Sequence, residues 1–359
     1  MRTKLYIYNP YPAVGGSETT LVRFINSIDK NKYDVVLLSL RNNINFFSKI
    51  RSINLNSTST FFSFFKIRKI LLNDTSKNKI FFSMQYFVNI WSVIFLKNIN
   101  NTKIFIYEVN HPNELNYNFN FVEFLKKKII KFLVIRFYKN AHLICGNSSE
   151  LSKDLYKMVN KKVLTIYNPC FFKLNKIKRK IHIRKIKVLN IARFEMQKDH
   201  MTLLKAIVHS KYKSRIQLNL VGYGSQKNNI IEYALSNKIN LKIYESEKNL
   251  KKFYKQNDIY ISTSLYEGLP TTMVEAASFC MPIISSNFKS GANEILQYGN
   301  AGHLFEISDY IKLSKIINNF FEKKKIFYIK EKKCRKILPT FSYIKNIRKF
   351  NKSLDFLAK

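Results

Sequence analysis

The chain has 359 residues, 46% of them hydrophobic, and its 62 Lys and Arg against 23 Asp and Glu give a formal net charge of +39. This length and hydrophobic content exclude a globally disordered chain and allow two domains of ordinary size. We expect no secretory signal, because residues 1–9 read directly as a strand. We also expect no spanning helix, because the longest apolar stretch, 81–96, is interrupted by Gln85 and Asn89.

The positive charge has two interpretations. Either a lysine-rich composition coats the surface with solvated cations, or the charge serves an anionic membrane surface, a phosphorylated substrate or nucleic acid. Nucleic acid is the least favoured partner, because no RRM, KH, zinc-finger or basic-zipper pattern is present. The four cysteines show no C-x-x-C pair and no metal-ligand spacing, which favours reduced core residues and no metal site.

The first half of the chain begins with a predicted strand at residues 4–8. A turn-rich loop containing Gly15 and Gly16 follows, and then a helix over 17–28 with apolar residues at helical spacing. Two glycines before a helix let a ligand approach the backbone closely, and the helix N-terminus aims free N–H groups at an anion. The alternative is an ordinary strand-to-helix turn capped by Ser17 or Glu18.

Further strands of this half are predicted by short apolar runs at 33–40, 79–83, 103–107, 141–145 and 162–166. Ser148 is the predicted N-cap of a helix that ends near 158. Residues 42–78 hold two Phe-rich pieces and a basic patch, and they give no clear assignment. His111 follows the end of strand 103–107 and precedes a proline, which suits a site residue better than a core residue. A solvated loop histidine is the alternative.

Residues 121–139 predict the most basic amphipathic helix of the chain, with Lys and Arg side chains around a set of apolar ones. Such a helix can lie on anionic lipid, with about 1 kcal/mol of attraction for each basic residue near the surface. Alternatively, it is a scaffold helix whose apolar face is buried in the domain and whose outer face is coated with lysine.

The second half alternates regularly between strands and helices after a basic linker placed near 168–186. The predicted strands are 187–192, 216–221, 240–244, 259–262, 282–285 and 303–305, and the helices between them include 199–211, 225–236 and 248–256. This alternation predicts a doubly wound parallel sheet with right-handed crossovers. A final helix is predicted near 341–356.

The stretch 257–295 predicts one βαβ unit that carries two carboxylates, Glu267 and Glu275, at the carboxyl end of a parallel strand. Pro270 has the fixed φ that suits a first helical position, and Glu275 lies about one turn into the helix. Ligands bind at this end of the strands in open α/β sheets, so we expect a binding site here.

The sequence E-G-L-P-T-T-M-V-E-A contains E-x7-E and, with Asp258 before it and S-G-A-N-E-I after it, resembles the retaining GT-B glycosyltransferases of the "glycosyl transferases group 1" family. Further pieces stand in the order that the family uses; they are Gly15-Gly16-Ser17-Glu18, Tyr167-Asn168-Pro169, Arg193 with Lys198, and Gly222-Tyr223-Gly224. Ala192 departs from the family's usual glycine before the arginine. The resemblance covers essentially the whole chain.

This resemblance implies a GT-B fold, in which two Rossmann-like doubly wound domains face a cleft and a C-terminal helix crosses back. It makes 1–168 the acceptor domain, 169–340 the nucleotide-sugar donor domain, and 341–359 a helix that packs on the N-terminal domain. It also implies a metal-independent reaction that uses a UDP- or GDP-linked sugar as co-substrate.

The resemblance implies roles for particular side chains as well. Glu267 would hold hydroxyls of the donor sugar, and His111 would lie beside that sugar from the other domain, so these two are the catalytic candidates. A guanidinium and an ammonium can neutralise the donor diphosphate, a helix N-terminus can add to this, and a carboxylate can accept from ribose hydroxyls. The donor-binding candidates are Gly15, Gly16, Arg193, Lys198, Gly222, Gly268, Leu269, Pro270, Thr271 and Glu275.

The expected activity is transfer of a hexose, with retention of configuration, to a glycan or lipid-linked glycan during surface polysaccharide or lipopolysaccharide biosynthesis. The charge suggests a cytoplasmic protein peripheral to the inner face of the cytoplasmic membrane. Three alternatives stay open: an inverting GT-B enzyme, a sugar-nucleotide epimerase on the same architecture, and a non-catalytic basic protein that binds anionic membrane or nucleic acid.

Overall fold

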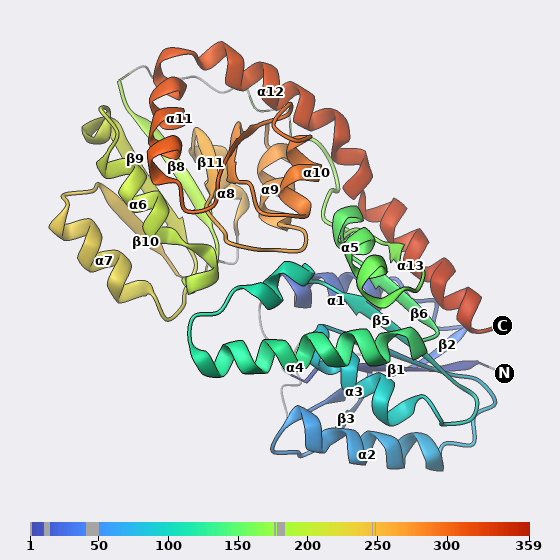
Figure 1. The fold of residues 1–359 in the computed structure, drawn as a ribbon. Coiled ribbons are helices and arrows are strands. Elements are labelled where there is room, and N and C mark those ends of the chain that lie inside the picture. Colours follow the sequence, from blue (N-terminus) through green and yellow to red (C-terminus); the bar gives the residue numbers. More distant parts are fainter. Residues whose placement is uncertain are drawn as a thin grey trace. The chain divides into compact units, whose positions relative to one another are not determined.

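The computed structural model describes residues 2–10, 15–40, 50–175, 177, 184–245, 247 and 249–359. The chain divides into two compact units (Figure 1): unit 1 comprises Met1–Pro169 and Tyr343–Lys359, and unit 2 comprises Cys170–Ser342. Each unit has its own parallel sheet and its own hydrophobic core. Parts of the loop 9–18, of the segment 42–78 and of the basic linker lie outside the described residues.

Unit 1 is built on a seven-stranded parallel sheet with the order β3-β2-β1-β4-β5-β6-β7. This order, reversing direction at β1, is that of a doubly wound sheet. Continuous apolar runs form these strands because helices cover both faces. The strands are β1 (Thr3–Tyr8), β2 (Tyr33–Ser39), β3 (Arg51–Asn54), β4 (Lys79–Met84), β5 (Thr102–Glu108), β6 (Leu143–Gly146) and β7 (Leu164–Thr165).

Helices pack on the two faces of this sheet through separate hydrophobic clusters. One face carries α1 (Gly16–Asn26) and α13 (Tyr343–Leu357), whose Phe24 and Phe350 rings stack with centroids 4.2 Å apart. The C-terminal helix therefore completes the core of unit 1. The other face carries α2 (Thr60–Asn73), α3 (Tyr86–Leu96), α4 (Phe121–Phe137) and α5 (Ser149–Val159), with the short helices η2 (Pro112–Asn116) and η3 (Tyr138–Asn140) at the ends of α4.

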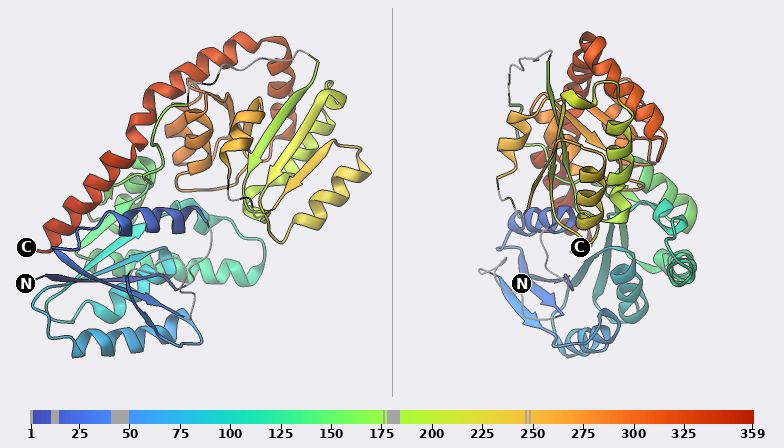
Figure 2. Two further views of the ribbon diagram at one scale, coloured as in Figure 1. Left: turned by 180° about the vertical axis from the view of Figure 1, so that it is seen from behind. Right: turned by 90° about the vertical axis from the view of Figure 1, so that its left-hand side faces the viewer.

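Unit 2 repeats the same plan with six parallel strands in the order β10-β9-β8-β11-β12-β13, seen from two further directions in Figure 2. Its strands are β8 (Ile186–Ile191), β9 (Ile216–Val221), β10 (Leu241–Tyr244), β11 (Ile259–Ser262), β12 (Ile283–Ser286) and β13 (His303–Phe305). Its helices are α6 (His200–Val208), α7 (Lys227–Ser236), α8 (Lys251–Gln256), α9 (Thr271–Ser278), α10 (Gly291–Leu296), α11 (Tyr310–Glu322) and α12 (Lys324–Ile337), with short turns η4 (Met196–Lys198), η5 (Lys213–Arg215) and η6 (Leu338–Phe341).

The two predicted doubly wound parallel sheets are confirmed, with several local corrections. The unassigned segment 42–78 holds β3 and α2, which the sequence pattern did not reveal. Helix α9 begins at Thr271, so Pro270 is its N-cap rather than its first helical residue. One apolar face of α4, with Ile130, Leu133, Val134 and Phe137, packs on the core, as the scaffold interpretation expected, but six other apolar side chains are exposed, so the outer face is not coated with lysine alone. No helix in the described ranges is long and apolar enough to cross a membrane.

Candidate active site

The loops that follow β8 and β11 bring two predicted site residues together in unit 2. Lys198 Nζ lies 3.0 Å from Glu267 Oε1, and the two side chains are only 12% and 18% exposed. Ser264 Oγ donates a 2.7 Å hydrogen bond to the same carboxylate oxygen. These strands are neighbours in the sheet, so residues far apart in the sequence meet at their carboxyl ends.

Hydrogen bonds to backbone carbonyl groups hold the two loops to each other around this pair. Leu265 N donates to Gln197 O at 2.8 Å, and Gln197 Nε2 donates back to Tyr266 O at 2.6 Å. Thr263 Oγ1 donates to Lys198 O at 2.9 Å. The ammonium and the carboxylate are therefore held in place by their main chains, which is the preorganisation that a charge-stabilising site needs.

Hydrogen bonds from the loop that follows β12 fix the turn before α9. Gly268 O accepts hydrogen bonds from Gly291 N at 2.8 Å and from Ser290 Oγ at 2.7 Å. A side chain at position 291 has no room, because its Cβ would come within 2.8 Å of Gly268, Leu269 and Pro270. This packing holds the turn that leads into α9, and the first backbone N–H groups of a helix have no acceptor in a preceding turn.

Glu275 lies on α9 and is held by a tyrosine that the sequence interpretation did not single out. Tyr254 Oη, on α8, donates to Glu275 Oε2 at 2.8 Å, and its ring is buried. One turn earlier on α9, Thr272 Oγ1 accepts a 2.7 Å hydrogen bond from Tyr260 Oη. Burial raises the pKa of both phenols, and the nearby Glu275 raises it further, so both remain donors at neutral pH.

Arg193 and Gly222 follow the carboxyl ends of the neighbouring strands β8 and β9. The Arg193 side chain is exposed and forms no ion pair or side-chain hydrogen bond within the described ranges, so its guanidinium is available. Gly222 has φ +154°, and a Cβ there would lie 1.9 Å from Ala192 O. The close approach of these two strand ends therefore requires glycine at 222.

Two predicted donor-binding glycines belong to unit 1. Gly15 is the N-cap of α1, and its carbonyl accepts from Thr19 N at 3.0 Å, while Gly16 is the first helical residue. The cap has no side-chain hydrogen bond, so the capping by Ser17 or Glu18 that the alternative interpretation expected does not occur. Instead Ser17 Oγ donates to Glu18 Oε2 at 2.9 Å, which places a carboxylate in the first turn of the helix.

His111 is the other predicted site residue of unit 1, and it is only 1% exposed. This burial contradicts the alternative of a solvated loop histidine. Its Nδ1 accepts from Asn113 N at 3.1 Å, and its Nε2 lies 3.4 Å from Asp154 Oδ2. Because Nδ1 accepts, Nε2 carries the ring proton and faces the carboxylate.

The loop that carries His111 is anchored by a fully buried carboxyl group at the end of β5. Glu108 Oε1 accepts from Val109 N at 3.0 Å, and its Oε2 accepts from Tyr138 Oη at 2.9 Å and from Asn89 Nδ2 at 3.2 Å. Burial raises the pKa of this carboxyl from its ordinary value to about 8, although the hydrogen bonds oppose the shift. Sequence reasoning missed Glu108, because a carboxylate at a strand end gives no sign of burial.

The raised pKa of Glu108 predicts a stability that depends on pH. Between pH 4.5 and about 8 the native state holds this proton while the unfolded chain releases it, so the free energy of unfolding falls as the pH rises through this window. We expect this fall to be smaller in Glu108→Gln. Urea unfolding of both proteins across the window measures it.

The difference between the unaltered protein and Glu108→Gln cancels the contributions of the other titrating groups to the pH dependence. Burial lowers the pKa of His200 and, with half-burial, that of His303, and their opposite contribution is common to both proteins. A difference in unfolding free energy that is constant with pH would contradict the assignment of Glu108.

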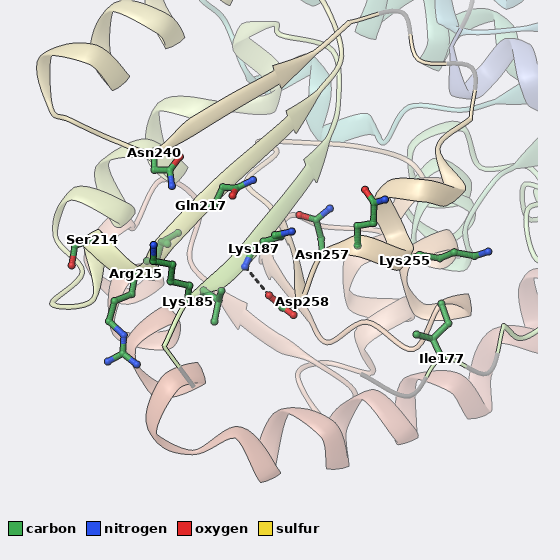
Figure 3. A pocket seen from close by; sticks show the side chains of 13 residues that line it. Ile177, Lys185, Lys187, Ser214, Arg215, Gln217, Asn240, Lys255, Asn257 and Asp258 are labelled. Carbon is green, nitrogen blue, oxygen red and sulfur yellow. Dashed lines mark hydrogen bonds between the residues drawn. The ribbon is translucent and has the colours of Figure 1, made fainter. Parts of the chain in front are cut away.

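A cavity of about 420 Å³ lies at the amino ends of β8, β9 and β11 (Figure 3). Its wall includes Lys187 and Asp258, and Asp258 Oδ2 accepts a 2.7 Å hydrogen bond from Lys187 N. Glu267 follows the opposite end of β11, so this cavity does not contain the predicted donor-binding residues. Asp258, which was part of the resemblance, joins the starts of two strands.

The described residues hold no group of three or more His, Cys, Asp or Glu side chains that could bind a metal ion, and independence from metal stays a prediction. Residues 173–337 match the family model described as "Glycosyl transferases group 1". This segment contains the unit 2 candidates from Arg193 to Glu275, so the group 1 match covers the Lys198–Glu267 pair and α9.

Two relatives with glycosyltransferase names match this chain over stretches longer than this segment. An uncharacterised glycosyltransferase of Methanocaldococcus jannaschii is 32% identical over 233 residues, which are 58% of this chain and only 55% of that protein. In Campylobacter jejuni, the enzyme named N-acetylgalactosamine-N,N'-diacetylbacillosaminyl-diphospho-undecaprenol 4-alpha-N-acetylgalactosaminyltransferase is 24% identical over 260 residues, which are 69% of this chain and 68% of the enzyme.

The fold is shared with solved glycosyltransferase structures over nearly the whole length. Anabaena HepE in complex with UDP-glucose aligns with a TM-score of 0.79 at 15% identity, covering 99% of this chain and 100% of that chain. The protein therefore has the GT-B fold, as the sequence predicted.

Proposed function

We propose that the protein is a glycosyltransferase that moves a hexose from a nucleotide-sugar donor to a glycan or lipid-linked glycan, with retention of anomeric configuration. The observation that carries this proposal is the Lys198–Glu267 pair, held 3.0 Å apart beside the start of α9 in the segment that matches the group 1 family. The name of the Campylobacter relative describes transfer to a diphospho-undecaprenol-linked sugar, and the HepE structure contains UDP-glucose.

The donor diphosphate would be bound by Lys198 and the exposed Arg193, together with backbone N–H groups at the start of α9. A cation pair and a helix N-terminus both stabilise the negative charge that grows on the leaving phosphate. The hydrogen bond from Tyr254 orients the carboxylate of Glu275 for ribose hydroxyls. Glu267 would accept from hydroxyls of the donor sugar, and Gly222 lets the backbone turn closely.

Catalysis would combine Glu267 of unit 2 with His111 of unit 1, and Gly15 and Gly16 would complete donor binding. Residues 1–168 would bind the acceptor and 169–340 the donor, while 341–359 packs on the N-terminal domain. In a front-side displacement the leaving phosphate takes the acceptor proton. This scheme retains configuration without a base on the opposite side of the sugar ring.

The acceptor would belong to surface polysaccharide or lipopolysaccharide biosynthesis, and the donor would be a UDP- or GDP-sugar used without a metal. A diphospho-lipid acceptor, as in the name of the Campylobacter relative, would place the protein on the inner face of the cytoplasmic membrane. The net charge of +39 suits an anionic membrane surface.

A nucleotide-sugar screen tests the proposed function. UDP-, GDP- and ADP-sugars are compared by thermal shift and by slow donor hydrolysis, first with the unaltered protein and then with Glu275→Ala. We expect one nucleotide class to raise the melting temperature and to be hydrolysed, because a ligand that binds only the native state stabilises it.

Both effects should disappear in Glu275→Ala. They should persist in the control variant Glu322→Ala, because the Glu322 carboxylate pairs with Lys211 on the outside of α11. A protein that responds to no nucleotide sugar, or that responds equally with and without Glu275, would overturn the assignment.

A further inference from the structure

The outward side of α4 carries many apolar side chains, which an ordinary surface helix would not expose. Its side chains at 121, 125, 129 and 132 share one side at helical spacing. Six apolar side chains of this helix are between 45% and 72% exposed: Phe121, Val122, Leu125, Ile129, Phe132 and Ile135. The described residues leave this side uncovered.

The inward side of α4 packs on the core through Ile130, Leu133 and Phe137, and it also holds one buried lysine. Lys127 is buried, forms a 2.8 Å ion pair with Glu123, and donates to Tyr117 O. Val134 is buried in the same cluster as the sheet. The helix is therefore fixed in an orientation that directs its phenylalanines outward.

Helices α2 and α3 continue this surface on the same side of the sheet, where α3 packs between α2 and α4 (Figure 1). Their aromatic rings touch in a chain: Phe61 and Trp91 have centroids 4.7 Å apart, and Phe65 and Phe95 have centroids 4.9 Å apart. Further exposed apolar side chains of these helices are Phe62, Phe65, Leu72 and Phe87. Together with the six of α4, these four make up what we call the outward apolar face.

Basic side chains border this face and indicate its partner. Lys126, Lys128, Lys131 and Arg136 are exposed on α4, which has one acidic residue in its length. Lys128 Nζ lies 4.4 Å from the centre of the Phe124 ring, a cation–π distance. Aromatic and aliphatic side chains among lysines fit the boundary between lipid headgroups and acyl chains, where the ammonium groups meet phosphates.

We propose, building on the proposed function, that the outward apolar face docks on an anionic lipid bilayer. Phe121, Leu125 and Phe132 insert below the headgroups, and the neighbouring lysines bind lipid phosphates. Insertion of apolar side chains distinguishes this mode from purely electrostatic attraction of the whole basic chain. The face lies on unit 1, so docking does not use the donor-binding residues of unit 2.

Vesicle co-sedimentation of the full chain tests the inference. Vesicles of phosphatidylcholine alone are compared with vesicles containing about one third phosphatidylglycerol. The salt is about 0.15 M, because salt at this concentration screens the attraction between lipid phosphates and basic side chains that lie far from the membrane surface. We expect binding to the anionic vesicles only. Phe121→Ser with Phe132→Ser should weaken that binding at least about tenfold, because two aromatic rings no longer enter the lipid.

Two further variants separate the contribution of the basic side chains from an unspecific effect of changing an exposed apolar residue. Lys126, Lys128 and Lys131 changed together to Gln should also weaken binding strongly, by about fivefold for each charge removed. Leu235→Ser is the matched control, since this leucine is 73% exposed on α7 of unit 2, and it should leave binding unchanged. All the changed side chains are exposed, and circular dichroism checks that each variant is folded.

Three outcomes would overturn the inference. The unaltered protein does not bind the anionic vesicles; or it binds them equally well after the phenylalanine changes; or the phenylalanines instead mediate self-association without lipid. Because vesicle binding needs no sugar donor, a protein that docks but transfers no sugar would overturn the proposed function and leave the docking face intact.

Discussion

Replacing Lys198 with alanine is expected to lower kcat/KM for the nucleotide-sugar donor by about 100- to 1,000-fold, the scale of losing one preorganised group that stabilises developing negative charge. The change removes the cation 3.0 Å from Glu267 and leaves that carboxylate, which is only 18% exposed, without its ion-pair partner. Steady-state kinetics with the donor found in the nucleotide screen measure the effect.

The control for this experiment is Lys211→Ala. Lys211 forms a similar ion pair with Glu322 at 2.6 Å, but its side chain is 61% exposed and lies away from the β8 and β11 loops. We expect kcat/KM to stay within about twofold of the original value, because an exposed pair contributes little. Unchanged kinetics in a folded Lys198→Ala protein would remove this residue from the proposed site.

Replacing Gly222 with alanine is expected to destabilise unit 2 by at least about 3 kcal/mol, because a strained backbone and a clash act together. The backbone has φ +154°, and the new Cβ would lie 1.9 Å from the carbonyl oxygen of Ala192, which cannot move without shifting the end of β8. Urea unfolding measures the change, and donor affinity should fall with it, since Arg193 follows Ala192 directly.

Gly299→Ala separates the cost of backbone strain from the cost of the steric clash with Ala192 O. Gly299 also has a positive φ, +90°, but nothing lies within 4 Å of the position that a Cβ would take. Only the backbone term remains there, which is about 1 to 2 kcal/mol. Equal destabilisation in the two variants would mean that the contact with Ala192 O is relieved at no cost.

The sequence predicted the architecture well where periodicity and chain order were informative. Alternating apolar strands and helices predicted both sheets, and the predicted N-cap of α5 is confirmed, because the Ser148 side chain accepts from Leu151 N. The sequence pattern did not predict α2 in its Phe-rich segment, because aromatic residues on several sides of a helix hide the helical period. The ring of Phe61 contacts Phe62 and Phe65 within α2, and it also contacts Trp91 on α3.

The candidate site was predicted in its residues but not in its supporting contacts. Lys198 and Glu267 could be named because each stands in a local motif. Their partners Ser264 and Gln197 depend on the pairing of β8 with β11, and Tyr254 depends on how α8 packs against α9. These contacts are tertiary. No local spacing distinguishes a tyrosine that orients a carboxylate from a tyrosine that only fills a core.

The course of the main chain through the two units has a consequence for dissecting the protein. Unit 2 is a continuous segment whose two ends are joined, since Phe171 N donates to Phe341 O at 3.0 Å. The ends of the interrupted unit 1 are also close, because Tyr167 N donates to Asn346 Oδ1 at 3.1 Å. Unit 2 is thus an insertion in the chain of unit 1, and a single new junction would close unit 1 without it. A shortened chain that stops at Pro169 lacks the Phe350 side of the unit 1 core, whereas a short peptide linking Pro169 to Tyr343 retains it.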